Sequence, residues 1–219
     1  MVSKMAVTIK LLAHSGFEIK GGGKIIYIDL EEHASPSEKG DIVLSTHSHY
    51  DHCDPAQIKK VSREDTVIIA PEDCISKLSG NVKALKPGEE TMIDNIKIKA
   101  LHAYNIKRFR SPGNPYHPKG FGVGYVITVE GKRIYHAGDT DFIPEMKELK
   151  DIDVALLPTG DTYTMDNIEA AEAAIAINPR IAIPMHTWGK DVTPFKEKVE
   201  KNSKIKVVVL KEGEEYTLE

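Results

Sequence analysis

The sequence predicts an α+β fold in which two β-sheets pack face to face with helices on their outer sides. Two observations support this prediction. Segments with strand-like alternation or continuous apolar character are separated by segments that carry helix-start signals. The strand-rich segments also occur twice in similar form, so we expect two related halves within one domain that spans residues 1–219.

The internal similarity is clearest in two hairpin-like segments. "GFEIKGGGKIIYIDL", which starts at Gly16, aligns without a gap with "GYVITVEGKRIYHAG", which starts at Gly124. Each segment contains an alternating strand, a glycine-containing turn and a second strand, which is typical of a β-hairpin. Further on, "DIVLSTH" from Asp41 corresponds to "DVALLPT" from Asp153, and both read as buried strands. We therefore expect pseudo-duplicated halves, each with a hairpin followed by a buried strand.

Helices are expected after these strands. Asp54 and Pro55 provide an N-cap and a first-turn proline for a helix through "AQIKKV". Asp166 and Glu169 resemble a capping box that opens "NIEAAEAAIAI". A last helix, "FKEKVEKN", is expected after Thr193, and "IKVVVL" is expected to be the final strand.

Composition limits the classes of protein. The chain has 219 residues, of which 41% are hydrophobic and 28% charged, and its net charge is -4, which argues against a generic nucleic-acid binder. We find no membrane-spanning stretch and no secretory signal, so we expect a cytoplasmic protein with no membrane partner. The two cysteines cannot form a disulfide framework. The sequence leaves open whether the chain forms a homo-oligomer.

The segment "LSTHSHYDHCDP" concentrates side chains that bind metals. His47, His49, Asp51 and His52 lie within six positions, between a predicted strand end and a predicted helix start. Four such ligands cannot comfortably surround one tetrahedral ion, so we expect them to be shared by two. Further candidates follow later strands: Asp139 in "HAGDTDF" could bridge two cations, and His186 ends the strand in "IAIPMHTW".

These motifs, in this order, resemble the metallo-β-lactamase superfamily. "HAYN", "YHAGDTDFIPEM" and "ALLPTGDTYTMDNIEAA" resemble its branch of small microbial hydrolases related to ascorbate-6-phosphate lactonase and N-acyl phosphatidylethanolamine phospholipase D. The resemblance implies an αββα four-layer sandwich with a binuclear site at one edge. It also implies the ligands, with Asp139 as the bridge: His47 and His49 for the first metal, and Asp51, His52 and His186 for the second.

The sequence does not decide which residue is the third ligand of the first metal. The superfamily usually places a third histidine between the two motifs, where this chain has Asn105 in "LHAYN". His102 and His117 are the substitutes, and we favour His117 because it lies on a Gly/Pro-rich loop. Asp29, at a strand end, is a candidate acceptor for a ligand histidine.

The expected function is hydrolysis of an ester, lactone or phosphodiester in a small, anionic molecule by a metal-activated water. Asp51 is the candidate catalytic residue, and His102 or a metal-bound water are alternative proton donors to the leaving group. The basic loop with Lys107, Arg108 and Arg110 is the candidate substrate-binding segment. Two divalent ions are expected, with zinc first and manganese, iron or nickel as alternatives. The alternatives are a non-catalytic metal- or ligand-binding module with a degenerate site and a nuclease of the same superfamily.

Overall fold

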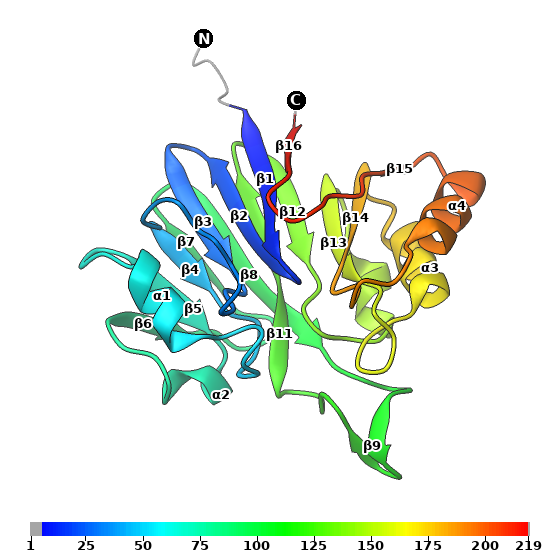
Figure 1. The fold of residues 1–219 in the computed structure, drawn as a ribbon, viewed down its shortest axis with the longest axis horizontal. Coiled ribbons are helices and arrows are strands. Elements are labelled where there is room, and N and C mark those ends of the chain that lie inside the picture. Colours follow the sequence, from blue (N-terminus) through cyan, green and yellow to red (C-terminus); the bar gives the residue numbers. More distant parts are fainter. Residues whose placement is uncertain (1–5, 219) are drawn as a thin grey trace.

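A computed structural model describes residues 6–218 and contains two large sheets packed face to face (Figure 1). Residues 1–5 and 219, which belong to the expected domain, lie outside the described residues. The first sheet has seven strands. In spatial order they are β16 (Glu215–Leu218), β1 (Val7–Ala13), β2 (Gly16–Gly21), β3 (Lys24–Ile28), β4 (Ile42–Leu44), β5 (Val67–Ala70) and β6 (Asn81–Ala84).

The second sheet also has seven strands, and a small two-stranded hairpin projects beside it (Figure 1). The strands of the second sheet in spatial order are β15 (Lys206–Val207), β14 (Ile181–Met185), β13 (Val154–Pro158), β12 (Lys132–His136), β11 (Gly122–Val129), β8 (Ile96–Ala103) and β7 (Glu90–Ile93). The projecting hairpin consists of β9 (Phe109–Ser111) and β10 (Asn114–Pro115).

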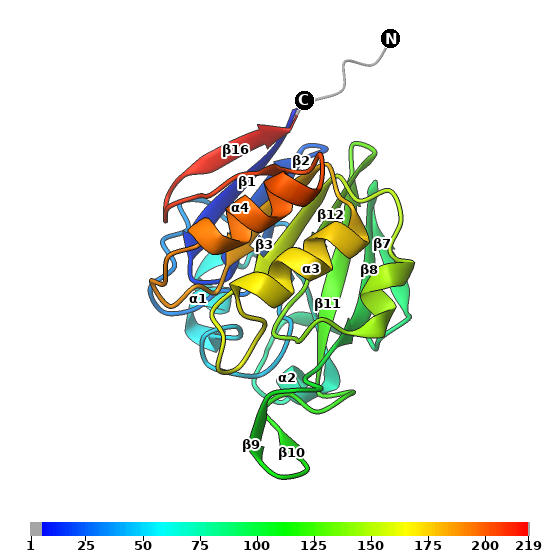
Figure 2. The same cartoon turned by 90° about the vertical axis from the view of Figure 1, so that its right-hand side faces the viewer.

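Helices cover the outer face of each sheet. On the first sheet, α1 (Pro55–Val61) and α2 (Glu72–Ile75) bury apolar side chains in one outer cluster. On the second, α3 (Asn167–Ile177) and α4 (Thr193–Asn202) lie across the strands, next to the short helix η1 (Pro144–Glu148) (Figure 2). Apolar side chains from the inner faces of both sheets form a third cluster between them. The expected αββα sandwich is therefore confirmed.

The predicted hairpins are formed and have matching turns. In the β2–β3 hairpin Gly21 pairs with Lys24, and in the β11–β12 hairpin Val129 pairs with Lys132. Each turn therefore has two central residues, and all four have positive φ (Gly22 60°, Gly23 73°, Glu130 50°, Gly131 74°). Two positive φ angles define the type I′ turn, whose twist suits a hairpin. Glycine fits this conformation without strain.

The halves also share their strand order. The first hairpin is flanked by antiparallel β1 and parallel β4, and the second by antiparallel β8 and parallel β13. Asp41 accepts a hydrogen bond from the backbone N–H of Ile25 (2.8 Å), and Asp153 accepts one from Arg133 (2.9 Å). These pairs occupy equivalent positions, so the duplication predicted from sequence extends to individual side-chain contacts.

Two local predictions need correction. "IKVVVL" forms only the short β15, and the final strand is β16, which leaves the second half and pairs with β1. Asp166 caps α3 as expected, but the carboxylate of Glu169 does not close the capping box. It accepts hydrogen bonds from the backbone N–H of Phe142 and the guanidinium of Arg108 instead, since these tertiary partners compete with the local one.

Candidate metal centre and its cavity

The segment with clustered ligands is held between two regular elements, as predicted. It follows β4 and ends at α1, where Asp54 accepts hydrogen bonds from the backbone N–H groups of Ala56 (2.7 Å) and Gln57 (3.3 Å). Pro55 occupies the first helical turn. The strand end and the capped helix thus fix both ends of the loop that carries the histidines.

Three histidines form the first group. His49 Nδ1 lies 3.0 Å from His47 Nε2 and 3.3 Å from His117 Nε2. Nitrogens bound about 2.0–2.1 Å from one tetrahedral ion are separated by roughly 3.3 Å, so this spacing suits a shared cation. Of the three sequence candidates for the third position, the structure brings His117 into the group.

The second group contains Asp51, His52 and His186, together with His14. Asp51 Oδ2 lies 3.7 Å from His52 Nε2 and 4.0 Å from His186 Nε2. The potential ligand atoms of all four residues lie within 4.8 Å of one another. The structure therefore assembles a second cluster of cation-binding groups from both halves of the fold.

Asp139 lies between the two groups. Its Oδ2 is 3.4 Å from His117 Nε2 and 3.3 Å from His186 Nε2, and its Oδ1 is 3.4 Å from His52 Nε2. It follows β12 in the "GDTD" turn and is almost fully buried. The carboxylate thus contacts members of both groups, as a bridging ligand would.

Buried polar atoms in this cluster lack ordinary partners. Within residues 6–218, His52 Nε2, Asp139 Oδ1 and His186 Nε2 are buried without a hydrogen-bond partner. An unpaired buried polar atom is costly, so convergence of several at one point is typical of a site that binds a cation. Imidazole nitrogens and carboxylate oxygens together suit zinc and related divalent cations. The residues present therefore fit a metal centre.

The electrostatics of the cluster prepare most of its groups for cation binding. Burial lowers the pKa of His117 to about 4 and holds the pKa of His47 well below its usual range. Against the effect of burial, His186 and His52 keep the pKa of Asp139 well below its usual range. Also against burial, the carboxylates of Asp139 and Asp29 raise the pKa of His52 to about 10. Neutral imidazoles and ionised carboxylates are the forms that bind metals, so His47, His117 and Asp139 already have the required charge, whereas His52 must lose a proton when a cation binds.

Hydrogen bonds behind the cluster fix two histidine tautomers. Asp29 accepts a hydrogen bond from His52 Nδ1 at 2.7 Å, which confirms the sequence-based expectation for Asp29. The Thr46 hydroxyl donates to Asp29 (2.7 Å), so its oxygen is left to accept from His47 Nδ1 (3.0 Å). In both histidines the acceptor holds the proton on Nδ1, so Nε2 is the nitrogen directed at the cluster.

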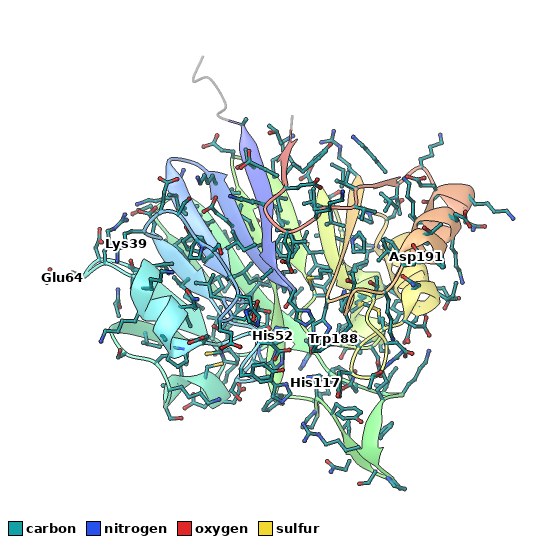
Figure 3. The ribbon with its side chains drawn as sticks, in the orientation of Figure 1. Lys39, His52, Glu64, His117, Trp188 and Asp191 are labelled. Atoms are coloured by element: carbon teal, nitrogen blue, oxygen red, sulfur yellow. The ribbon has the colours of Figure 1, made fainter. Side chains whose placement is uncertain are left out.

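A cavity of about 350 Å³ opens above these groups. In Figure 3 the labelled His52, His117 and Trp188 lie close together at the lower centre, on the opposite side of the molecule from the start of β1 and the end of β16. Polar groups of the cluster form part of the cavity wall, and aromatic side chains and one guanidinium form the rest. The lining residues are His49, Tyr50, Asp51, Arg110, Tyr116, His117, Asp139, Tyr163, His186 and Trp188.

Only part of the predicted basic segment reaches this cavity. Arg110 lines it and lies over the Tyr116 ring, 5.4 Å from the centroid. Arg108 instead forms ion pairs with Asp141 (2.8 Å) and Glu169 (2.6 Å). Lys107 also points to Glu169 and lines a different depression. Thus Arg110 reaches the cavity, whereas the charges of Lys107 and Arg108 are engaged elsewhere.

His102 is placed away from the cluster. Its side chain borders a separate depression together with Leu101 and Tyr135, beside η1. It therefore does not supply the third histidine of the first group. Asn105 lies behind His117 and contacts it through hydrogen bonds.

His14 belongs to the second group, although it was not among the predicted ligands. Its ring lies 3.9 Å from that of His186 and its Nε2 is 3.6 Å from Asp51 Oδ2. Burial, followed by the neighbouring His186 and His52, lowers the pKa of His14 to about 3. The sequence indicated a position at the pocket for His14, in "AHSG", but not a role among the ligands.

Of the aromatic wall, the sequence indicated only the basic, aromatic loop that contains Tyr116. Tyr116 meets Tyr163 edge to face at 4.8 Å, and Trp188 lies 4.6 Å from the His14 ring. Trp188, the single tryptophan of the chain, follows His186 by two residues. That proximity was a usable signal, but the contribution of Tyr163 depends on a turn after β13 that the sequence did not place.

Comparisons with known proteins agree with this fold and site. A family model described as "Beta-lactamase superfamily domain" matches residues 8–186. A protein named UPF0173 metal-dependent hydrolase from Pyrococcus abyssi is 34% identical over 232 residues, covering 97% of this chain and all (100%) of that protein. A similarly named protein from Pelotomaculum thermopropionicum is 32% identical over 227 residues, covering 96% of this chain and 99% of that protein.

Solved structures show the same architecture. A protein from Parabacteroides distasonis superposes with a TM-score of 0.86 at 40% identity, covering 93% of this chain and 92% of the other. Igni18, described as a metallo hydrolase from Ignicoccus hospitalis, gives a TM-score of 0.80 at 28% identity, covering 98% and 99%. The chain therefore belongs to the metallo-β-lactamase superfamily, and its curated relatives place it in the family named UPF0173 metal-dependent hydrolases.

Proposed function

We propose that this protein is a metal-dependent hydrolase that cleaves an ester, lactone or phosphodiester bond in a small anionic molecule. One observation carries the proposal: two groups of imidazole and carboxylate ligands, joined by Asp139, converge at the floor of an open cavity. The names of the curated relatives support the metal dependence and the hydrolytic class.

The ligand arrangement suits two divalent cations, and zinc is our first choice because histidine predominates among the ligands. His47, His49 and His117 would hold the first, Asp51, His52 and His186 the second, and Asp139 both. Such ions act as Lewis acids that polarise a carbonyl or phosphoryl oxygen and make water nucleophilic near neutral pH.

The chain itself positions the substrate. Arg110 presents a guanidinium at the cavity wall, where it can pair with a carboxylate or phosphate. Tyr116 and Tyr163 form an apolar face beside it, against which the uncharged part of the substrate can pack. Asp51 lies between the second ligand group and the cavity, with 14% of its side chain exposed. It is therefore the carboxylate best placed to touch the reacting bond.

The alternative function, a non-catalytic binding module with a degenerate site, rests on the absence of a histidine at position 105, where the superfamily usually has the third one. His117 supplies an imidazole at that place from a later segment of the chain. This observation favours the enzyme over the binding module.

The proposal is tested by elemental analysis of metals per chain in gently purified protein, next to the His117→Ala variant. We expect about two ions in the parent and a decrease towards one in the variant, with His102→Ala as a control that keeps both. The metal found would then be used in a screen of lactones and phosphodiesters. One ion or fewer in the parent would contradict a binuclear hydrolase.

A further inference from the structure

We infer that Asn105 is the positioning residue of His117, and that Asp141 and Arg108 hold Asn105 in the required orientation. The inference rests on the proposed function, in which His117 binds the first metal ion. It assigns a role to Asn105, which stands where the superfamily usually has a histidine, and to Arg108, which does not reach the cavity.

Three hydrogen bonds join Asn105 to His117. The Asn105 N–H donates to the His117 carbonyl oxygen at 2.8 Å. The side-chain oxygen of Asn105 then accepts from both the backbone N–H and the ring Nδ1 of His117, each at 2.8 Å. Because an amide oxygen only accepts, Nδ1 must carry the proton. The Nε2 lone pair of His117 is consequently directed at His49 and Asp139.

The same contacts exclude Asn105 as a direct ligand. Both hydrogen bonds to its side-chain oxygen come from His117, on the side of the ring opposite to the metal-facing Nε2. An amide oxygen has two lone pairs, and here both are used. Asn105 therefore acts on the metal through His117, in the way that Asp29 acts through His52.

Asp141 determines which way the Asn105 amide faces. The Asn105 Nδ2 donates to Asp141 Oδ1 at 3.1 Å and to the Tyr163 carbonyl oxygen at 2.9 Å. A flipped amide would direct its oxygen at these two acceptors. An aspartate at position 105 would place a second carboxylate against Asp141, so the position requires an amide.

Asp141 is in turn fixed by the loop and by Arg108. It is fully buried, and its Oδ2 accepts from the backbone N–H groups of Ile106 and Lys107, each at 2.7 Å. Arg108 donates to its Oδ1 at 2.8 Å and also pairs with Glu169. A buried carboxylate needs such a partner. Asp141 follows Asp139 by two residues, so one turn supplies the bridging carboxylate and also anchors the loop that leads to His117.

The test is a zinc titration of metal-free protein against a chromophoric chelator, which resolves the two binding steps, followed by cobalt absorption spectra of each site. Asn105→Ala should weaken the first-site affinity by about 10- to 100-fold and leave the second step unchanged. His117→Ala should remove the first step, and His102→Ala, three residues before Asn105, should change neither. Asn105→Asp should also weaken the first step, because it opposes two carboxylates.

The two binding steps separate positioning from a general loss of structure, because misfolding would weaken both steps and lost positioning only the first. If Asn105→Ala does not fold, the nearly isosteric Asn105→Asp decides the question. Unchanged two-step binding and unchanged cobalt spectra in the Asn105 variants would overturn the inference while the proposed function stands. A parent protein that binds no zinc would contradict the proposed function itself.

Discussion

At the scale of single residues, we expect Asp51 to be required for turnover but not for binding of an anionic ligand. Both Asp51 and Asp139 line the cavity, but 14% of the Asp51 side chain is exposed and only 4% of the Asp139 side chain. We expect Asp51→Ala to reduce turnover by at least about 100-fold, roughly 3 kcal/mol of transition-state stabilisation. Binding of an anionic ligand should persist, as measured by the fluorescence of Trp188. Asp65→Ala, an exposed carboxylate, serves as the control, and turnover retained in Asp51→Ala would contradict this role.

Arg110 is expected to act on substrate binding. Removing a charged hydrogen bond typically costs about 1.5–3 kcal/mol, so Arg110→Ala should raise KM for an anionic substrate by about 10- to 100-fold. The value of kcat should change little, because a guanidinium that holds a distant anion contributes equally to the ground and transition states. Steady-state kinetics check this, with Lys107→Ala as the matched control from the same loop. Equal effects of the two variants would count against the assignment.

Equivalent hairpins allow a paired experiment at the scale of elements. Asp41 and Asp153 each accept a hydrogen bond from the backbone N–H of the strand that precedes them. Leaving a partly buried donor unsatisfied costs about 1–3 kcal/mol, so Asp41→Ala and Asp153→Ala should each lower the free energy of unfolding by that amount. Urea denaturation measures both values. A large effect in one half and none in the other would show that the two contacts are not energetically equivalent.

Hairpins were predictable because their signals are local. Alternation and glycine turns fixed the β2–β3 and β11–β12 hairpins, and Asp54 with Pro55 fixed the start of α1. The clustered histidines were also visible, since they lie within a few residues. The contribution of Tyr163 and the place of His14 among the ligand groups were not visible, because both depend on long-range packing. For the same reason Arg108 read as a free cation, although Asp141 and Glu169 neutralise it.

At the scale of the whole molecule, the candidate metal centre joins the two halves of the sandwich. His52 follows β4 in the first sheet, whereas Asp139 and His186 follow strands of the second. The site therefore lies where the halves meet, and its occupancy should affect the stability of the entire fold.

None of the helices in residues 6–218 is long and apolar enough to cross a membrane.

Metal removal should accordingly lower the melting temperature. An ion present at 100 times its Kd stabilises the folded state by about 2.7 kcal/mol if the unfolded chain does not bind it. For a chain of this size, that corresponds to a difference of about 5–10 °C. Calorimetry with and without a chelator measures the difference. His117→Ala should show a smaller one, and a melting temperature that is independent of chelator in the parent would contradict the expectation.

The pairing of β16 with β1 has a consequence for how the chain acquires its structure during synthesis. Val7 lies opposite Leu218, so one edge of β1 is paired by a strand that is synthesised after every other strand of residues 6–218. Contacts between such distant residues form late, because a long loop must close before they can contribute. Until residues 215–218 leave the ribosome, β1 is an unpaired sheet edge, which is a site for aggregation. Nascent chains that stall shortly before these residues should therefore depend on chaperones.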